Sequence, residues 1–226
     1  MIILQNIIES KYHYQPSWLL VVIILGVMIL GYIYSAFNSK FNTFVKAVFL
    51  SRFLVQASRE ERSLSHPVSL LLSFNFNLIS SLLILQIICS GLLFSSGIEF
   101  TLPSFLLINL IILAIYFIKI LFLKILSFII DKLQTISEYI FIIFLVNQFF
   151  GIVFLPIVIF IAYSPSSFRT LFIYVGIVMI CAAFLIRVGK GISTVLANRQ
   201  ATLFYLILYF CTLEILPLLI GIKLLE

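Results

Sequence analysis

The sequence is poor in charged residues, and aspartate is almost absent. Of 226 residues only 10% are Asp, Glu, Lys or Arg, against about 25% in a typical soluble domain. Asp131 is the single aspartate, and His13 and His66 are the two histidines. A chain with so few ionisable groups lacks the polar surface of a water-soluble globular protein, so the sequence excludes a soluble fold.

The scarcity of these groups also bears on chemistry. A single aspartate argues against aspartyl-phosphate or two-metal catalysis, and neither an HExxH nor a GxSxG motif occurs. The distribution of basic residues predicts that the two histidines lie on opposite sides of a membrane, where they cannot share a metal ion. The three cysteines, Cys89, Cys181 and Cys211, all lie in apolar runs, which favours buried thiols over a disulfide framework. We therefore expect no enzyme activity, no metal and no other cofactor.

What the sequence has in abundance is long apolar runs. Hydrophobic residues make up 63% of the chain, and the mean hydropathy is +1.28. The runs are continuous rather than alternating, as in residues 19–25 and 141–146, which favours helices over a β-barrel. A helix satisfies its own backbone hydrogen bonds in lipid, and about 20 apolar residues cross a bilayer. Six segments qualify: Trp18–Phe37, Val68–Phe94, Pro103–Leu123, Tyr139–Ala162, Phe168–Ile186 and Thr202–Leu224.

These runs predict an all-α, polytopic membrane protein, one integral membrane domain over residues 1–226 with six transmembrane helices. The basic residues predict its orientation, because lysine and arginine are enriched in cytoplasmic loops. Eleven of the fourteen fall in alternate connections: Lys40, Lys46, Arg52, Arg59, Arg62, Lys119, Lys124, Lys132, Arg187, Lys190 and Arg199. The other three are Lys11, Arg169 and Lys223. Both termini should therefore face the outer, periplasmic side, and the three basic connections should face the cytoplasm.

The cytoplasmic segments offer candidate contacts for lipids or partner proteins. Residues 40–58 carry apolar side chains at helical spacing with Lys46 and Arg52 elsewhere on the wheel, which predicts an interfacial amphipathic helix. Residues 124–133 either do the same or extend the preceding helix. Arg59 and Arg62 flank two glutamates in a compact charged corner that is either a solvated salt-bridge cluster or a docking site. Arg187 and Lys190 stand beside glycines in a predicted loop that lacks the spacing of a phosphate-binding motif but would admit a lipid headgroup.

One carboxylate, Glu214, lies deep in a predicted span. A charge at the bilayer centre is costly, so this side chain should face other helices rather than lipid. Helical rise places several amides within a few ångströms of its depth: Asn75, Asn77, Asn109, Asn147 and Gln148. Such a layer is either an ion or proton relay or polar substrate site, or a set of interhelical hydrogen bonds that fixes packing. Pro217, three residues further on, would kink the helix beside Glu214. Lys119 and Arg187 are predicted nearer the cytoplasmic face, with side chains that snorkel outward.

The last two predicted spans carry a recognisable pattern. Phe168-Arg169 opens the fifth span, Arg187 and Lys190 close it, and residues 208–218 read LYFCTLEILPL. This resembles an uncharacterised inner-membrane family of the Bacteroidota, domain of unknown function 4271. The resemblance implies a multi-pass protein of the bacterial inner membrane and implies no activity. Glu214 and Pro217 coincide with the family's recurrent Glu-Ile-x-Pro element.

Two hypotheses of different class follow. The first is a non-enzymatic inner-membrane subunit of a larger envelope complex, associated in one version with protein export or secretion, with membrane lipids and other envelope proteins as partners and no nucleic acid. The second is a small transporter or ion-coupled carrier that uses Glu214. An internal repeat would favour the carrier, and the third and sixth predicted spans share no polar placement.

Overall fold

The structure of the chain, a computed structural model, describes residues 16–36, 67–91, 99–130 and 133–197. Over these ranges it contains five α-helices and no strand: α2 (Ser17–Ala36), α5 (Pro67–Cys89), α6 (Leu102–Ile130), α7 (Leu133–Tyr163) and α8 (Ser166–Ala197). The prediction of an all-helical chain is confirmed for this part. The predicted sixth span, the predicted interfacial helix, and with them Arg52, Arg59, Arg62, Glu214 and Pro217, lie outside the described residues.

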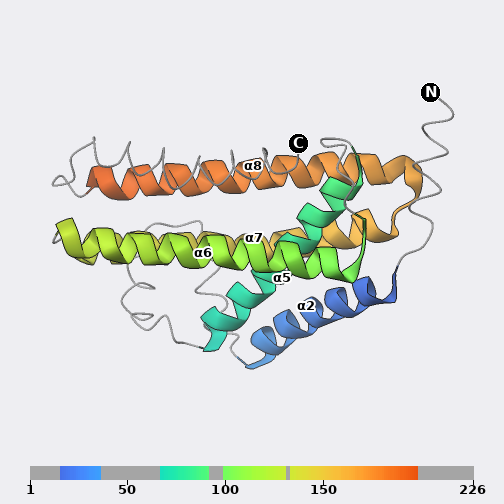
Figure 1. The fold of residues 1–226 in the computed structure, drawn as a ribbon, viewed down its shortest axis with the longest axis horizontal. Coiled ribbons are helices and arrows are strands. Elements are labelled where there is room, and N and C mark those ends of the chain that lie inside the picture. The colour runs from blue at the N-terminus through green and yellow to red at the C-terminus, as the bar shows by residue number, and fades with distance from the viewer. Residues whose placement is uncertain (1–15, 37–66, 92–98, 131–132, 198–226) are drawn as a thin grey trace.

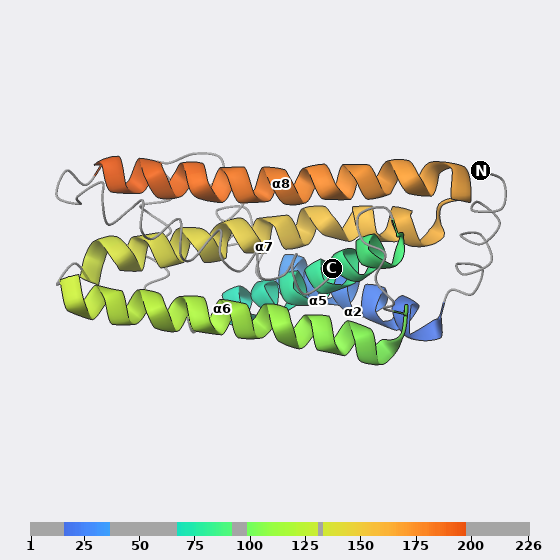
Figure 2. The ribbon, with the colours of Figure 1, turned by 45° about the horizontal axis from the view of Figure 1, so that its top comes forward.

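The helices form a bundle built around α5. Helices α6, α7 and α8 run nearly parallel to one another, and α5 crosses them obliquely with α2 packed along its side (Figures 1 and 2). Helix α5 contacts all four other helices, most extensively α7, and α7 in turn packs on α8. The ends of α6, α7 and α8 project beyond α2 and α5 on one side of the bundle (Figure 2).

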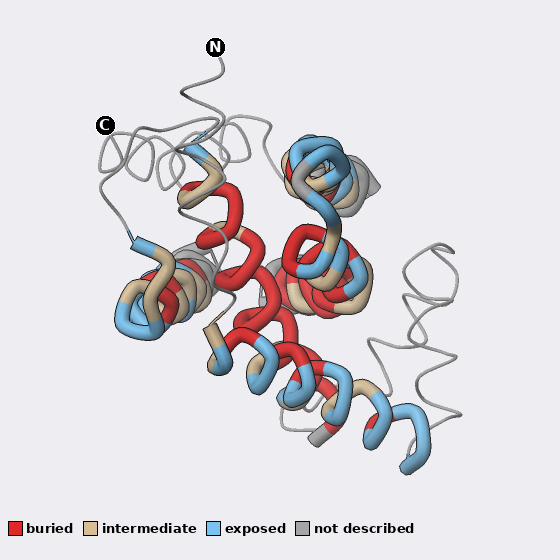
Figure 3. The backbone as a smooth tube through the Cα atoms, turned by 90° about the vertical axis from the view of Figure 1, so that its right-hand side faces the viewer, coloured by how far each residue is buried: buried red, intermediate tan, exposed pale blue. Residues whose placement is uncertain are grey.

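Burial follows this arrangement. The apolar stretches of α5 and α7 are mostly buried, whereas those of α2, α6 and α8 are mostly exposed. Figure 3 shows the buried positions gathered on α5 and on the side of α7 that faces it. The fully buried side chains include Ile79, Leu82 and Leu83 on α5 and Val146 and Val158 on α7. Two central helices, wrapped by three with apolar outer faces, are the arrangement expected of a bundle surrounded by lipid rather than water.

Small residues let the central helices approach closely. A Cβ atom added at Gly151 of α7 would lie 2.8 Å from the Cα atom of Phe76 on α5, so only glycine fits there. At Gly26 of α2 the same atom would lie 2.9 Å from Cδ1 of Ile79. Close approach at glycine is the usual way in which membrane helices gain van der Waals contact, because lipid provides no hydrophobic drive between helices.

The helix bounds correct several predicted spans. The span predicted to end at Phe94 is wrong at that end, since α5 stops at Cys89. Gly91 follows with φ of +68°, a left-handed conformation that glycine adopts without strain and that terminates helices. Hydropathy had carried the prediction through this turn, because the residues beyond it are still apolar.

Three other helices, α6, α7 and α8, are longer than predicted. Helix α6 continues past Leu123 to Ile130, which settles residues 124–130 as an extension of the helix. Helix α7 begins at Leu133, six residues before the predicted start, and α8 continues from Ile186 to Ala197. The loop predicted at Arg187 and Lys190 is therefore wrong, because both lie within α8. The predicted spans end directly before Lys124 and Arg187, whereas arginine and lysine are good helix formers and need not end a helix.

All five helices are long and apolar enough to cross a membrane. At about 1.5 Å per residue, α6, α7 and α8 each exceed 40 Å, more than the roughly 30 Å of a hydrocarbon core. Large apolar side chains lie exposed along them, such as Leu110 on α6 and Val178 on α8. These features together indicate a membrane-embedded protein.

Candidate functional site

Polar side chains follow one face of α5 at every fourth residue. Ser69, Ser73, Asn77 and Ser81 repeat at a spacing that aligns them along the helix, and the first, third and fourth are buried. The hydroxyl of Ser81 also donates to the carbonyl of Leu78 at 2.8 Å, as serine hydroxyls do within apolar helices. We refer to these four residues as the polar ladder.

Gln148 of α7 binds the first two steps of the ladder. Its Nε2 atom donates to the Ser69 hydroxyl at 2.7 Å and the Ser69 carbonyl at 3.0 Å, and lies 3.2 Å from the Ser73 hydroxyl. Gln148 is buried. A buried amide that bridges two helices gives orientation as well as energy to their packing.

Asn109 of α6 binds the last two steps. The Nδ2 atom of Asn77 donates to Oδ1 of Asn109 at 3.1 Å, and Nδ2 of Asn109 donates to the Ser81 hydroxyl at 3.2 Å. The ladder therefore joins α5 to α7 at one end and to α6 at the other. The structure thus brings Asn77 and Asn109 together, as their predicted depth suggested, and gives Gln148 separate partners.

Two further amides on α5 are less well satisfied. Asn75 is fully buried, and neither of its amide atoms has a hydrogen-bond partner among the described residues. Gln86 donates to the carbonyl of Val158 at 3.3 Å, while its Oε1 atom is buried without a bond in the same part of the chain. An unbonded buried amide destabilises a core, so Asn75 is the unusual member of the predicted layer.

Asn147, next to Gln148, belongs to a different site. Its Oδ1 atom accepts a hydrogen bond from an Nη atom of Arg187 on α8, and the same Nη atom donates to the hydroxyl of Tyr116 on α6 at 3.2 Å. One guanidinium thus links α6, α7 and α8. The expectation that Arg187 snorkels outward is wrong: helical side chains lean toward the N-terminus of their helix, and this one turns into the bundle.

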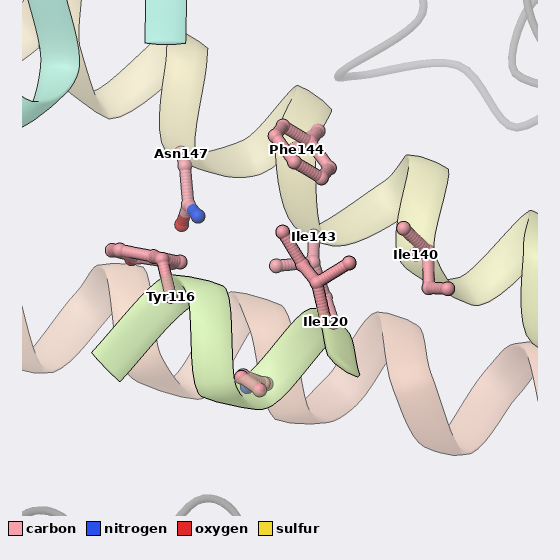
Figure 4. A pocket seen from close by; sticks show the side chains of 7 residues that line it. Tyr116, Ile120, Ile140, Ile143, Phe144 and Asn147 are labelled. Carbon is pink, nitrogen blue, oxygen red and sulfur yellow. The ribbon is translucent and has the colours of Figure 1, made fainter. Parts of the chain in front are cut away.

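Lys119 stands at the same place. It is only 6% exposed and lines a pocket with Tyr116 and Asn147, which the apolar residues Ile120, Ile140, Ile143 and Phe144 complete. Figure 4 shows the Asn147 amide directed at the Tyr116 ring across this pocket. We call Tyr116, Lys119, Asn147 and Arg187 the cationic niche, because Arg187 binds the phenol and the amide there and Lys119 lines the pocket beside them.

The niche lies near one end of the membrane-crossing length. The start of α6, the end of α7 and the start of α8 lie together at the far end of the bundle. Measured from there, Tyr116 is about 21 Å along α6, Asn147 about 24 Å along α7 and Arg187 about 32 Å along α8. For a hydrocarbon core of about 30 Å, Tyr116 and Asn147 fall inside the core and Arg187 falls at its edge. This edge is the one on the side where the three long helices project (Figure 1). It is also the side that the basic residues predict to be cytoplasmic.

Sequence reasoning named Asn147 and Arg187 but did not connect them, and it left out Tyr116. Two features of the sequence could have indicated this site. Tyr116 and Lys119 are three residues apart and so lie on one face of a helix, and Lys119 is a charged residue inside an apolar stretch. Lys190, one turn beyond Arg187, is half-buried in α8. The described ranges contain no cluster of three His, Cys, Asp or Glu side chains that could hold a metal ion.

Fold and site together define an all-helical, membrane-embedded bundle with a hydrogen-bonded polar interior and a cationic niche at one end. The chain belongs to the family described as Domain of unknown function (DUF4271), whose profile matches residues 19–225. No curated protein and no solved structure is significantly similar to the chain.

Proposed function

We propose that this chain is a multi-pass protein of the bacterial inner membrane and a non-enzymatic subunit of a larger envelope complex, associated with protein export or secretion. One observation carries this proposal: the amides that would line a transport path are bonded to neighbouring helices instead. Gln148 holds Ser69 and Ser73, and Asn77 holds Asn109. Bonds of this kind fix helix packing, and the groups that make them are engaged with neighbouring helices rather than with cargo.

The outer surface supports the same role. Helices α2, α6 and α8 expose apolar side chains over most of their length, and α6 packs mainly on α5 and α7. Such faces meet either lipid or the apolar helices of another subunit. A subunit that acts by association needs these faces and needs no catalytic group.

Site-specific photo-crosslinking in living cells tests the subunit role. A benzophenone side chain at exposed Leu110 of α6, or at exposed Val178 of α8, should form a discrete protein adduct with a partner. The same probe at Val146, which is fully buried in the core, is the matched control and should give no adduct. Lipid adducts alone at Leu110, Val178 and other outer positions, together with elution as a single chain in mild detergent, would overturn the proposal.

A small transporter is the second candidate, and Asn75 is the observation that favours it. A fully buried amide with no hydrogen bond in the described part of the chain is a place where a polar cargo or an ion would find a partner. This function predicts that Glu214→Gln and Asn75→Leu each abolish ion or solute flux in proteoliposomes while the protein still assembles. Flux that is absent from the unaltered protein, or equal in all three, argues against a carrier.

A further inference from the structure

The sixth span predicted from the sequence follows α8 closely along the chain. Helix α8 ends at Ala197, and the predicted span Thr202–Leu224 begins after residues 198–201. Two helices joined by so short a connection pack side by side and antiparallel. Residues 198–226 lie outside the described ranges, so the surroundings of α8 are what indicates the side on which the span packs.

The outer side of α8 is open. Leu171, Val178 and Leu185 recur there every seventh residue, and each is more than half exposed. The inner side of α8 packs on α7 and, over a shorter length, on α5.

The side of α8 toward α6 remains for the span. Helices α6 and α8 both pack on α5 and α7 but share few contacts with each other, and they lie apart in Figures 1 and 2. A span packed between α6 and α8 contacts both helices and leaves the outer side of α8 exposed, as it is observed.

In this position Glu214 comes to the depth of Arg187. Glu214 is twelve residues past Thr202, about 18 Å from the turn between the two helices. Arg187 is ten residues before Ala197, about 15 Å from the same turn, and its side chain leans further toward the N-terminus of α8. The carboxylate and the guanidinium are therefore at the same depth to within about one helical turn.

The direction of Arg187 agrees with this depth. Its guanidinium reaches across to α6, where it donates to the Tyr116 hydroxyl at 3.2 Å, and it also donates to Oδ1 of Asn147 on α7. A guanidinium fork matches a carboxylate through two parallel hydrogen bonds. A carboxylate deep in a membrane faces the bundle interior and pairs there with an opposite charge or a hydrogen-bond donor.

We propose that Thr202–Leu224 packs between α6 and α8 and that Glu214 forms an ion pair with Arg187. Glu214 is then a positioning residue: it holds the guanidinium toward Tyr116 and Asn147, and the pair ties the last span to α6, α7 and α8. The inference rests on the multi-pass membrane arrangement in the proposed function and does not depend on the subunit role.

A cysteine cross-link measures the position of the span. In the full-length protein with its three native cysteines changed to serine, a short bifunctional methanethiosulfonate should join Glu214→Cys to Arg187→Cys within one chain. Cleavage at a protease site inserted in residues 198–201 then leaves two fragments that stay together. This pair of substitutions removes both charges at once, so neither is left alone in the membrane.

The matched control pairs Glu214→Cys with Leu185→Cys. Leu185 lies two residues before Arg187, at nearly the same depth, but on the outer side of α8, where it is 67% exposed. This pair should not be joined. A link to Leu185→Cys, a link in neither pair, or a link between two copies of the chain would each overturn the proposal.

Thermal unfolding in one detergent tests the ion pair itself. Glu214→Gln and Arg187→Gln should each lower the melting temperature, because each leaves the opposite charge uncompensated. In the double variant the second substitution should add less than half of its own shift. Full additivity would overturn the ion pair. Where the single variants do not fold, a folded double variant supports the pair and an unfolded one contradicts it.

Arg169→Gln is the control for this comparison. Arg169 lies eighteen residues before Arg187 on α8, about 27 Å away along the helix, so its shift should add in full to that of Glu214→Gln. A partner adduct at Leu110 without coupling between Glu214 and Arg187 would remove this inference and leave the subunit role. Coupling without an adduct would remove only the subunit role.

Discussion

At the scale of the residue, hydrogen-bond pairing separates buried amides that stabilise this bundle from those that do not. Asn77 and Asn75 stand two residues apart on α5, and both are buried. Asn77 bonds to Asn109 on the neighbouring helix, whereas neither amide atom of Asn75 has a partner in the described ranges. The net stabilisation from a buried hydrogen bond is modest, but an unmade bond costs the full desolvation of the group.

The two asparagines therefore predict opposite results. Asn77→Leu should lower the free energy of unfolding by about 0.6–2 kcal/mol. The substitution removes an interhelical hydrogen bond and leaves the side-chain carbonyl oxygen of Asn109 without its donor. Asn75→Leu, similar in volume, should leave stability equal or higher. Thermal unfolding of the two purified variants in the same detergent measures the difference. Equal losses would show that Asn75 has a partner that compensates its burial.

The sequence identified the right polar residues and could not assign their partners. Helical rise gives the depth of a residue but not the direction in which its helix faces its neighbours. Asn147 and Gln148 were thus expected in one layer, yet consecutive residues point about 100° apart on a helix. One therefore meets Arg187 of α8 and the other meets Ser69 of α5.

At the scale of the element, the contact between α5 and α7 depends on one missing side chain. A Cβ atom added at Gly151 would lie 2.8 Å from the Cα atom of Phe76. Backbone atoms cannot rotate away from such a contact as a side chain can. Gly31 on α2 is also in a helix, but a Cβ atom there would have no neighbour within 4 Å. The two glycines differ in packing and not in local conformation.

Gly151→Ala should accordingly destabilise the bundle by about 1–3 kcal/mol, the usual effect of overpacking a tight contact. Gly31→Ala is the control and should be neutral or slightly stabilising, since alanine favours the helix. The midpoint of unfolding in a titration with a denaturing detergent compares them. A Gly151→Ala protein as stable as the original would mean that α5 and α7 pack less closely than described.

Element ends were the least predictable part of the fold. Five of the predicted spans correspond to helices in the structure, because continuous apolar runs have no other stable form in lipid. Their ends differ because hydropathy reports where lipid ends and backbone geometry decides where a helix ends. Gly91 stops α5 early, whereas nothing at Arg187 interrupts α8, which continues to Ala197.

At the scale of the whole molecule, the described helices alternate in direction between two ends of the bundle (Figure 1). The residues Thr101 and Ser164 lie at one end, beside the starts of α6 and α8, and Lys124 lies toward the other (Figure 1). Among the described residues, Lys119, Lys124, Arg187 and Lys190 lie toward the second end and Arg169 toward the first, which predicts that the second end faces the cytoplasm.

Single-cysteine labelling in intact cells tests this orientation. In a chain whose three native cysteines are serine, Ser164→Cys and Thr101→Cys should react with a membrane-impermeant maleimide, because their end should face the periplasm. Lys124→Cys should react only after the membrane is permeabilised. The reverse pattern would invert the topology. Alkaline phosphatase fused after Ser96 should be active and after Ser193 inactive, an independent check on the same sides.

The repeat of the polar ladder has a consequence for how α5 is held in place. Its hydrogen-bonding groups recur every fourth residue, so a slide of α5 by four residues, about 6 Å, would offer Ser73 and Asn77 to Gln148 in place of Ser69 and Ser73. Gln148 alone would therefore tolerate the shifted register. Asn109 would not, because the same slide would present Ser81 and Leu85 to it in place of Asn77 and Ser81, and the leucine cannot bond. The height of α5 in this bundle is thus set by the residue at which its polar repeat ends.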